Sequence, residues 1–205
     1  MDLWCTGGSR HPVCYLLYLC SGLMSGLEIE KKFLVRNNDY EHLALSHSHI
    51  QQGYICSDRG RTVRVRIRDH SGYLTIKGPS TDDGLSRYEF EKEISFEEAQ
   101  ELMKLCEKSK VTNKPLIIEK TRHFVEYGNH VFEVDEFHGD NQGLVIAEVE
   151  LKPGEDPDEI DLPDFINKED EVTGNRKYYN SQLLNNPFTL WKKDEESANQ
   201  SGLQV

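Results

Sequence analysis

Charged residues occupy every second position from 28 to 32, and this spacing constrains the fold of the chain more than any other feature. Successive side chains of a β-strand point to opposite faces, so residues two apart line the same face. As a strand, the segment 27–35 would present Glu28, Glu30 and Lys32 in one row. Two carboxylates and an ammonium in a row indicate a surface that can hold both a metal ion and an anion.

Six further segments carry the same pattern. Their rows at two-residue spacing are Arg64, Arg66 and Arg68; Tyr73, Thr75 and Lys77; Glu89, Glu91 and Glu93; Lys120 and Arg122; Glu133 and Asp135; and Glu148 and Glu150. The wet face of an amphipathic strand explains any single row. Solubility gives no reason to sort the signs by strand, however, and here whole strands are acidic or basic. We interpret the set as a closed sheet with a charged lumen, although periodicity alone does not determine which face points inward.

Length and charge limit the class of protein. A chain of 205 residues is expected to form one domain. The net charge of −12 excludes a typical nucleic-acid binder, which would carry a basic stripe and a high pI. The basic residues are concentrated in a few strands, which favours a local cationic site for a small polyanion. Five cysteines at irregular spacing indicate neither a disulfide framework nor a zinc site, and favour a cytoplasmic location.

The two ends of the chain fall outside the strand pattern. Residues 1–23 hold an apolar run too short to span a membrane, without a clean cleavage site. We interpret them as a leader outside the domain, with a targeting segment as the alternative. The domain is predicted to cover 24–191, and the polar tail 192–205 is predicted to be disordered. No membrane partner is expected, and the choice between monomer and homodimer stays open.

A few helices are predicted between the strands. Ser95 and Glu98 form a capping box that opens a helix with an apolar face at helical spacing. Shorter helices are expected over 39–47 and about 175–184, and the pair of histidines at 47 and 49 is assigned to a solvated turn or a helix end.

The ordered motifs resemble those of the CYTH superfamily, the triphosphate tunnel metalloenzymes. Glu-x-Glu-x-Lys alone would be weak, since such strings are common in helices, but the order of the whole set is specific over about residues 27–185. The matching motifs are Glu28-Ile29-Glu30-Lys31-Lys32, Gln52-Gly53-Tyr54, Arg64-Val65-Arg66, Thr75-Ile76-Lys77, Ser86-Arg87-Tyr88-Glu89, Glu119-Lys120-Thr121-Arg122, Glu133-Val134-Asp135, Glu148-Val149-Glu150 and Val172-Thr173-Gly174 through Asn180.

The resemblance implies an α+β fold: a closed eight-stranded antiparallel β-barrel, or tunnel, with a charged lumen, flanking helices and a C-terminal plug helix. Such a tunnel binds a linear triphosphate with one or two divalent cations, Mg²⁺ or Mn²⁺. Carboxylate oxygens suit these hard ions, and guanidinium groups bind phosphate in a bidentate manner.

Residue roles follow from the same resemblance. The implied metal ligands are Glu28, Glu30, Asp135, Glu148 and Glu150, with Glu91 or Glu133 as further contributors. The implied substrate-binding residues are Lys32, Arg64, Arg66, Lys77, Arg87, Lys120, Arg122 and, from the plug helix, Lys177 in preference to Arg176. Lys32 and Tyr54 are implied as the catalytic pair that activates water, because a neighbouring ammonium lowers the pKa of a phenol. A packed barrel tyrosine is the alternative for Tyr54.

Inorganic triphosphatase is the first functional expectation, because the chain is short and has no appended histidine-rich helical domain. Class IV adenylate cyclase is the second, yet its His-Phe element before the first strand is replaced here by Gly26-Leu27. Thiamine triphosphatase is the third. A non-catalytic polyphosphate-binding module would be expected to lose the metal carboxylates, and all five are present.

Overall fold

The computed structural model describes residues 29–58, 61–80, 87–152 and 154–191, and of these only the backbone at 29, 79–80 and 87–89. The predicted leader, the polar tail and Glu28 lie outside the described residues, as does the side chain of Arg87.

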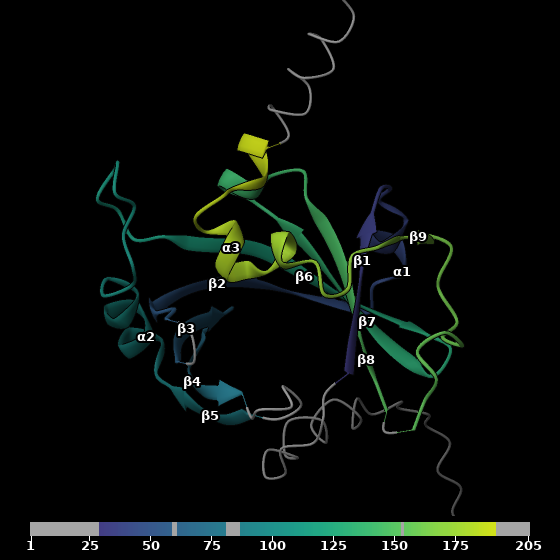
Figure 1. Ribbon diagram of the computed structural model, residues 1–205, viewed down its shortest axis with the longest axis horizontal. Helices are drawn as coiled ribbons and strands as arrows, with labels where there is room; N and C mark the ends of the chain where they lie inside the picture. The colour runs from purple at the N-terminus through teal and green to yellow at the C-terminus, as the bar shows by residue number, and fades with distance from the viewer. Residues whose placement is uncertain (1–28, 59–60, 81–86, 153, 192–205) are drawn as a thin grey trace, which may run out of the picture.

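Nine antiparallel strands form one sheet, in the order β5-β4-β3-β2-β6-β7-β8-β1-β9. The strands are β1 (Ile29–Val35), β2 (Ser46–Cys56), β3 (Thr62–Arg68), β4 (Ser71–Ser80), β5 (Arg87–Ile94), β6 (Ile117–Tyr127), β7 (His130–Phe137), β8 (Val145–Leu151) and β9 (Ile166–Glu171). Figure 1 shows the sheet as strongly curved, with β4 and β5 at one end and β1, β8 and β9 toward the other. Every predicted charged strand with described residues is therefore present.

One face of the sheet, which we call the apolar face, is covered by helices. Helix α1 (Asp39–Leu43) brings Tyr40 into a buried cluster with Phe33, Val134 and Val149. Helix α2 (Phe96–Met103) packs Ala99 against the β3 and β4 part of the sheet. The predicted capping box is confirmed, since the Ser95 hydroxyl accepts from the Glu98 backbone N–H while the Glu98 carboxylate accepts from the Ser95 N–H.

The opposite face, which we call the charged face, is apolar at one end, where the C-terminal segment covers it. The buried residues of this cluster are Tyr54, Ile118, Phe137, Leu144, Ile146, Leu183, Leu184 and Trp191. Two residues along β6 and β8, the same face carries Lys120 and Glu148. The C-terminal segment, drawn near β2 and β6 in Figure 1, thus covers the apolar end next to the charged rows.

The C-terminal helix is shorter than predicted. Instead of one helix over 175–184, the structure has the 3₁₀ turn η2 (Arg176–Tyr178) and the short helix α3 (Asn180–Leu183). Tyr179 separates them because its backbone is extended, with ψ at 137°. Packing of Leu183 and Leu184 on the sheet, rather than helix length, holds this segment in place.

The sheet differs in two ways from the predicted eight-stranded closed barrel. A ninth strand, β9, pairs with β1, and its sequence Ile-Asn-Lys-Glu-Asp-Glu lacks the alternation by which the others were found. Within the described ranges, the order of paired strands ends at β5 and β9 without pairing that closes the ring. The curved antiparallel sheet is confirmed, whereas the closed barrel is not.

The assignment at the histidine pair was wrong. His47 and His49 lie within β2, where they pair with His123 and Thr121 of β6, and helix α1 ends before them at Leu43. The histidines lie two residues apart and therefore share one face of the strand. This spacing is typical of a strand, but the pair was expected in a turn.

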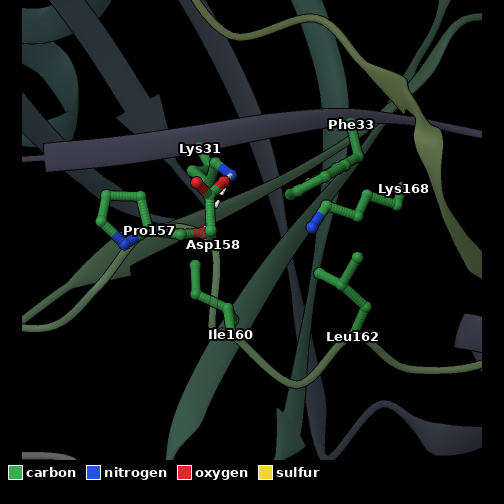
Figure 2. Close-up of a pocket in the computed structure, with 7 residues that line it drawn as sticks. All are labelled: Lys31, Phe33, Pro157, Asp158, Ile160, Leu162 and Lys168. Carbon is green, nitrogen blue, oxygen red and sulfur yellow. Dashed lines mark hydrogen bonds and ion pairs between the residues drawn. The ribbon is translucent and has the colours of Figure 1, made fainter.

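The acidic segment between β8 and β9 is held against the apolar face of β1 by Lys31. The Lys31 side chain is on this face because it alternates with Glu30 and Lys32 of the charged row. The Lys31 ammonium donates to the carbonyl of Pro157 at 2.9 Å and pairs with Glu171 at 3.1 Å. Figure 2 shows this ammonium beside Asp158, next to a small pocket that Phe33 also lines. Lys31, the first lysine of the opening motif, therefore fixes a loop rather than a ligand site.

In the part of the chain that the structure describes, no helix has both the length and the apolar character needed to cross a membrane.

Gly72 of β4 allows α2 to approach the sheet. A Cβ at this position would lie 2.6 Å from the Cβ of Ala99 and 2.8 Å from the backbone oxygen of Ser95. We expect Gly72→Ala to displace α2 and lower the free energy of unfolding by about 1–3 kcal/mol, measured by urea denaturation. Combining it with Ala99→Gly should recover part of the loss beyond additivity, and strict additivity would contradict the proposed clash.

Candidate functional site

A buried ion cluster forms the centre of the charged face, where β6 lies beside β7. The Arg122 guanidinium donates from Nε and Nη2 to the two oxygens of Asp135, both at 2.7 Å. Lys120 also donates to Asp135, and both of these side chains are only 1% exposed. Charges removed from water in this way are stable only when they are paired and hydrogen-bonded.

Arg122 extends this cluster to the neighbouring acidic strands. Its Nη2 donates to Glu148 of β8 at 3.0 Å, and its Nη1 contacts Glu133 of β7. Arg122 therefore joins carboxylates from two strands through one planar group, as the fork of donors in a guanidinium allows.

The cluster fixes the charges of its members. Burial alone would raise the pKa of Asp135, but the charges and hydrogen bonds of Arg122 and Lys120 outweigh burial and hold that pKa well below its usual value. Burial, only partly offset by Asp135, lowers the pKa of Lys120. For Arg122 the acidic partners outweigh burial, and its pKa is raised.

The opening motif forms a second group of charges at β1 and β8. The Lys32 ammonium donates to Glu30 at 2.9 Å and also to Glu148, the residue opposite it in the register. Burial works to lower the pKa of Lys32, but both carboxylates outweigh it and raise the pKa, so Lys32 is an ammonium. Desolvation and the charge of Glu148 raise the pKa of Glu30.

A third group joins β3, β4 and β5. Arg64 donates to the hydroxyl of Thr75 at 3.0 Å and pairs with Glu91 at 3.3 Å, while Thr75 donates to Glu91 at 2.7 Å. Burial and the charges of Arg64 and Arg122 lower the pKa of Arg66 to about 10. The Arg68 guanidinium donates to the Tyr73 hydroxyl at 2.9 Å and lies over its ring.

Residues 26–179 match the family model of the CYTH domain. The chain belongs to the CYTH domain family.

Two proteins illustrate what this CYTH domain is similar to. It is 45% identical over 172 residues to the inorganic triphosphatase of Acetivibrio thermocellus, an alignment that covers 82% of this chain and 99% of that protein. It is 25% identical to the inorganic triphosphatase NE1496, whose crystal structure gives a TM-score of 0.54 and coverage of 77% of this chain and 93% of that one. A second structure, described as the hypothetical protein NE1496, also gives a TM-score of 0.54 and is covered to 97%.

The CYTH domain brings most of the predicted residues to one face, but Tyr54 lies in different surroundings from Lys32. Tyr54 is buried in the apolar cluster under the C-terminal segment, whereas Lys32 contacts the two carboxylates. Lys177 places its ammonium 3.4 Å from the ring centroid of Trp191 in that segment, and Arg176 is exposed. Lys77 of β4 is half-buried, in the row that Thr75 shares.

The acidic strands offer donors for a hard cation. Glu30 lies opposite Glu150 in the β1–β8 register, and Glu30 and Glu148 share Lys32 as a partner. The raised pKa of Glu30 reflects, after desolvation, repulsion by Glu148, which a divalent ion between the two carboxylates would relieve. These residues fit a metal of that class, although no three metal-type side chains within the described ranges are already gathered around one point.

Sequence reasoning gave no role to two buried residues of the charged face, Thr75 and Gln52. Both side chains are fully buried, and Thr75 links Arg64 to Glu91. The period-two rule already placed Thr75 in a row with Lys77, but an uncharged residue in a charged row carried no signal of its own.

We expect Asp135→Asn to lower the free energy of unfolding by about 3–5 kcal/mol, because Lys120 and part of Arg122 would stay buried without a counter-charge. Urea denaturation with EDTA present measures this. Asp58→Asn, which breaks an exposed pair with Arg61, is the control and should change stability little. Equal effects of the two changes would contradict the burial argument.

Stability should also fall in acid. Asp135 and Glu148 have folded-state pKa values below their ordinary ones, so their contribution is full above the unfolded values of about 4 and is lost as the pH falls below them. Each carboxylate changes the free energy of unfolding by up to about 1.4 kcal/mol per pH unit in that window. Urea titrations between about pH 2.5 and 7, with EDTA, should show a smaller slope for Asp135→Asn than for the unchanged chain; equal slopes would contradict the assignment.

Proposed function

We propose that this chain is a divalent-metal-dependent hydrolase of triphosphates, and that it cleaves inorganic tripolyphosphate to pyrophosphate and phosphate. The observation that carries the proposal is the charged face, on which arginines and lysines lie among carboxylates that range from buried to partly exposed. The 45% identity to a protein named inorganic triphosphatase, over 99% of that protein, supports the same substrate class.

The cations of the charged face are proposed to bind the phosphate groups. Tripolyphosphate carries about four to five negative charges near neutral pH, and several guanidinium and ammonium groups are needed to balance them. The proposed set is Lys32, Arg64, Arg66, Lys77, Arg87, Lys120, Arg122 and Lys177. Arg66 is well suited because no carboxylate lies within ion-pair distance of it among the described residues, and its positive charge is close to those of Arg64 and Arg122.

The carboxylates are proposed to hold one or two Mg²⁺ or Mn²⁺ ions. The proposed ligands are Glu28, Glu30, Asp135, Glu148 and Glu150. A bound ion would neutralise phosphate charge and polarise the terminal phosphoryl group. Glu30 is the most accessible described member of the Lys32 group, with 43% of its side chain exposed, whereas Asp135 already accepts three hydrogen bonds from its own neighbours.

In the proposed reaction, a water oxygen bonds to the terminal phosphorus in line with the bridging oxygen, that P–O bond breaks, and pyrophosphate leaves. Lys32 and Tyr54 are proposed as the pair that activates the water. Glu30 and Glu148 hold Lys32 as an ammonium, so it cannot accept a proton. The proton of the water would therefore pass to a phosphate oxygen, while Lys32 neutralises the charge of the phosphate oxygens and the Tyr54 hydroxyl orients the water.

We also propose that the curved sheet closes into the predicted tunnel around the substrate, with β5 meeting the β1 side. Glu91 on β5 and Glu30 on β1 would then face one enclosed site. The protein is proposed to act in the cytoplasm, as a monomer or homodimer, in keeping with its irregularly spaced cysteines.

Phosphate release from tripolyphosphate, ATP and thiamine triphosphate should be measured with Mg²⁺, Mn²⁺ and Ca²⁺, together with formation of cyclic AMP. We expect tripolyphosphate to have the highest kcat/KM, and EDTA to abolish its turnover. Faster conversion of ATP to cyclic AMP would assign the chain to adenylate cyclases, and preference for thiamine triphosphate would replace the substrate. If the chain binds these triphosphates but hydrolyses none of them, it is a polyphosphate-binding module rather than an enzyme.

Glu30→Gln tests the metal ligands. Even partners outside the ligand shell of a metal typically contribute 10–100-fold to affinity or activity, so we expect this change to lower kcat/KM by at least about 100-fold. The melting temperature should change little because Glu30 is partly exposed. Glu169→Gln, on the exposed part of β9, is the matched control and should keep full activity. Retained activity in Glu30→Gln would remove Glu30 from the site.

A further inference from the structure

We propose that Gln52 is a substrate-binding residue: its amide nitrogen donates to a phosphate oxygen of the bound triphosphate, and its amide oxygen accepts from the Arg66 guanidinium. This inference rests on the proposed function and adds to it a neutral residue that contacts the substrate.

Gln52 lies on the charged face of β2, completely buried. Neither its Nε2 nor its Oε1 has a hydrogen-bond partner among the described residues. Buried amides almost always have partners, since leaving the groups unpaired costs folding free energy. A glutamine with two donors and an acceptor unused is therefore poorly explained by the fold alone.

The residues around Gln52 make an apolar side chain the simpler structural choice. Ile50 and Tyr54 lie two residues away on the same face, and Ile118 is its partner on β6. All three are buried. A methionine would fill a similar volume among them without unpaired polar atoms.

On the other side of Gln52, the unpaired polar groups continue. Arg66 is its partner on β3, and the Nε atoms of Arg66 and Arg64 are also buried without partners among the described residues. Opposite side chains on neighbouring antiparallel strands lie roughly 4.5–5.5 Å apart at Cβ, so the Gln52 amide is within reach of the Arg66 guanidinium. The donors of two strands thus converge at one place on the face.

The chemistry of these groups selects a polyanion. Guanidinium N–H groups and the Nε2 group of glutamine only donate, and phosphate oxygens only accept when they are ionised. An ionised phosphate has no hydrogen that it can donate to the Oε1 atom, so Oε1 needs a donor from elsewhere. The Arg66 guanidinium supplies this donor. A phosphate placed between Gln52 and Arg66 would therefore accept from Gln52 Nε2 and Arg66 Nε, while another N–H of Arg66 donates to Gln52 Oε1.

The test compares Gln52→Met and Gln52→Glu with the matched control Gln51→Met, whose side chain points to the other face beside Ile67 and Phe96. Without ligand, Gln52→Met should have an unchanged or higher melting temperature, because the unpaired amide is gone. Its kcat/KM for tripolyphosphate should fall roughly 10- to 100-fold, mainly through KM, the range expected for a hydrogen bond to a charged group. Gln52→Glu should lose more, since it adds a negative charge. Gln51→Met should match the unchanged chain.

Two results would overturn the inference. A lower melting temperature in Gln52→Met with unchanged KM and kcat/KM would make Gln52 a packing residue. Equal losses of activity in Gln52→Met and Gln51→Met would mean that the strand, not the amide, matters.

Calorimetry with diimidotriphosphate, whose two bridging nitrogens resist hydrolysis, separates this inference from the proposed function. If the unchanged chain binds the probe with Mg²⁺ but does not hydrolyse tripolyphosphate, the proposed activity fails, and a weaker affinity in Gln52→Met still supports the role of Gln52. If the unchanged chain binds no probe, both proposals fail. If it binds and hydrolyses, and Gln52→Met binds equally well, only the inference fails.

Discussion

The structure of the charged face depends on the buried contact between Arg122 and Asp135. Neither side chain could be removed from water alone, because an isolated buried charge costs far more than a domain of this size can compensate. Their bidentate contact, with Lys120 as a third member, makes it possible for β6 and β7 to carry charges at the centre of the sheet. The remaining charged rows are arranged around this centre, whose three members together carry one net positive charge.

The sorting of charge by strand follows from pairing between neighbouring strands. Basic β6 adjoins acidic β7, and acidic β5 is separated from basic β3 only by β4, so opposite signs meet in these two parts of the sheet. Arg122 contacts Glu133 and Arg64 contacts Glu91 in this way.

The same arrangement of charges affects how a metal ion and a phosphate would bind. A metal ion alone at Glu148 would take one carboxylate partner from each of Lys32 and Arg122, and a phosphate alone on these two cations would take the partners of Glu148. A metal and a triphosphate arriving together would replace all these pairs at once, so each should strengthen the binding of the other.

The sequence allowed prediction of the parts of the fold that depend on neighbouring residues. Two-residue spacing identified the charged strands, and the capping box at Ser95 identified α2. It did not reveal β9, because the run Asn167–Glu171 is polar throughout and becomes a strand only by pairing with β1. Pairing between the two edges of a sheet has no local signal either, and the closed sheet inferred from the charged rows is not confirmed among the described strands. For the site, residue type predicted which side chains share a face but not their contacts. Arg122 was expected to bind phosphate, and nothing local indicated that it also holds three carboxylates.

Burial divides the charged face into a fixed part and an exchangeable part. Asp135 and Lys120 are 1% exposed and make their hydrogen bonds with each other and Arg122, so a ligand would have to break a desolvated pair to reach them. Glu30 and Glu91 each leave 43% of the side chain exposed, and their ion pairs can be replaced at lower cost because water already solvates part of each group. Chemistry that needs charges to change partners is therefore expected at the β1–β8 and β3–β5 sides of the face. The Arg122 cluster between them acts as the rigid positive centre toward which both sides present their ligands.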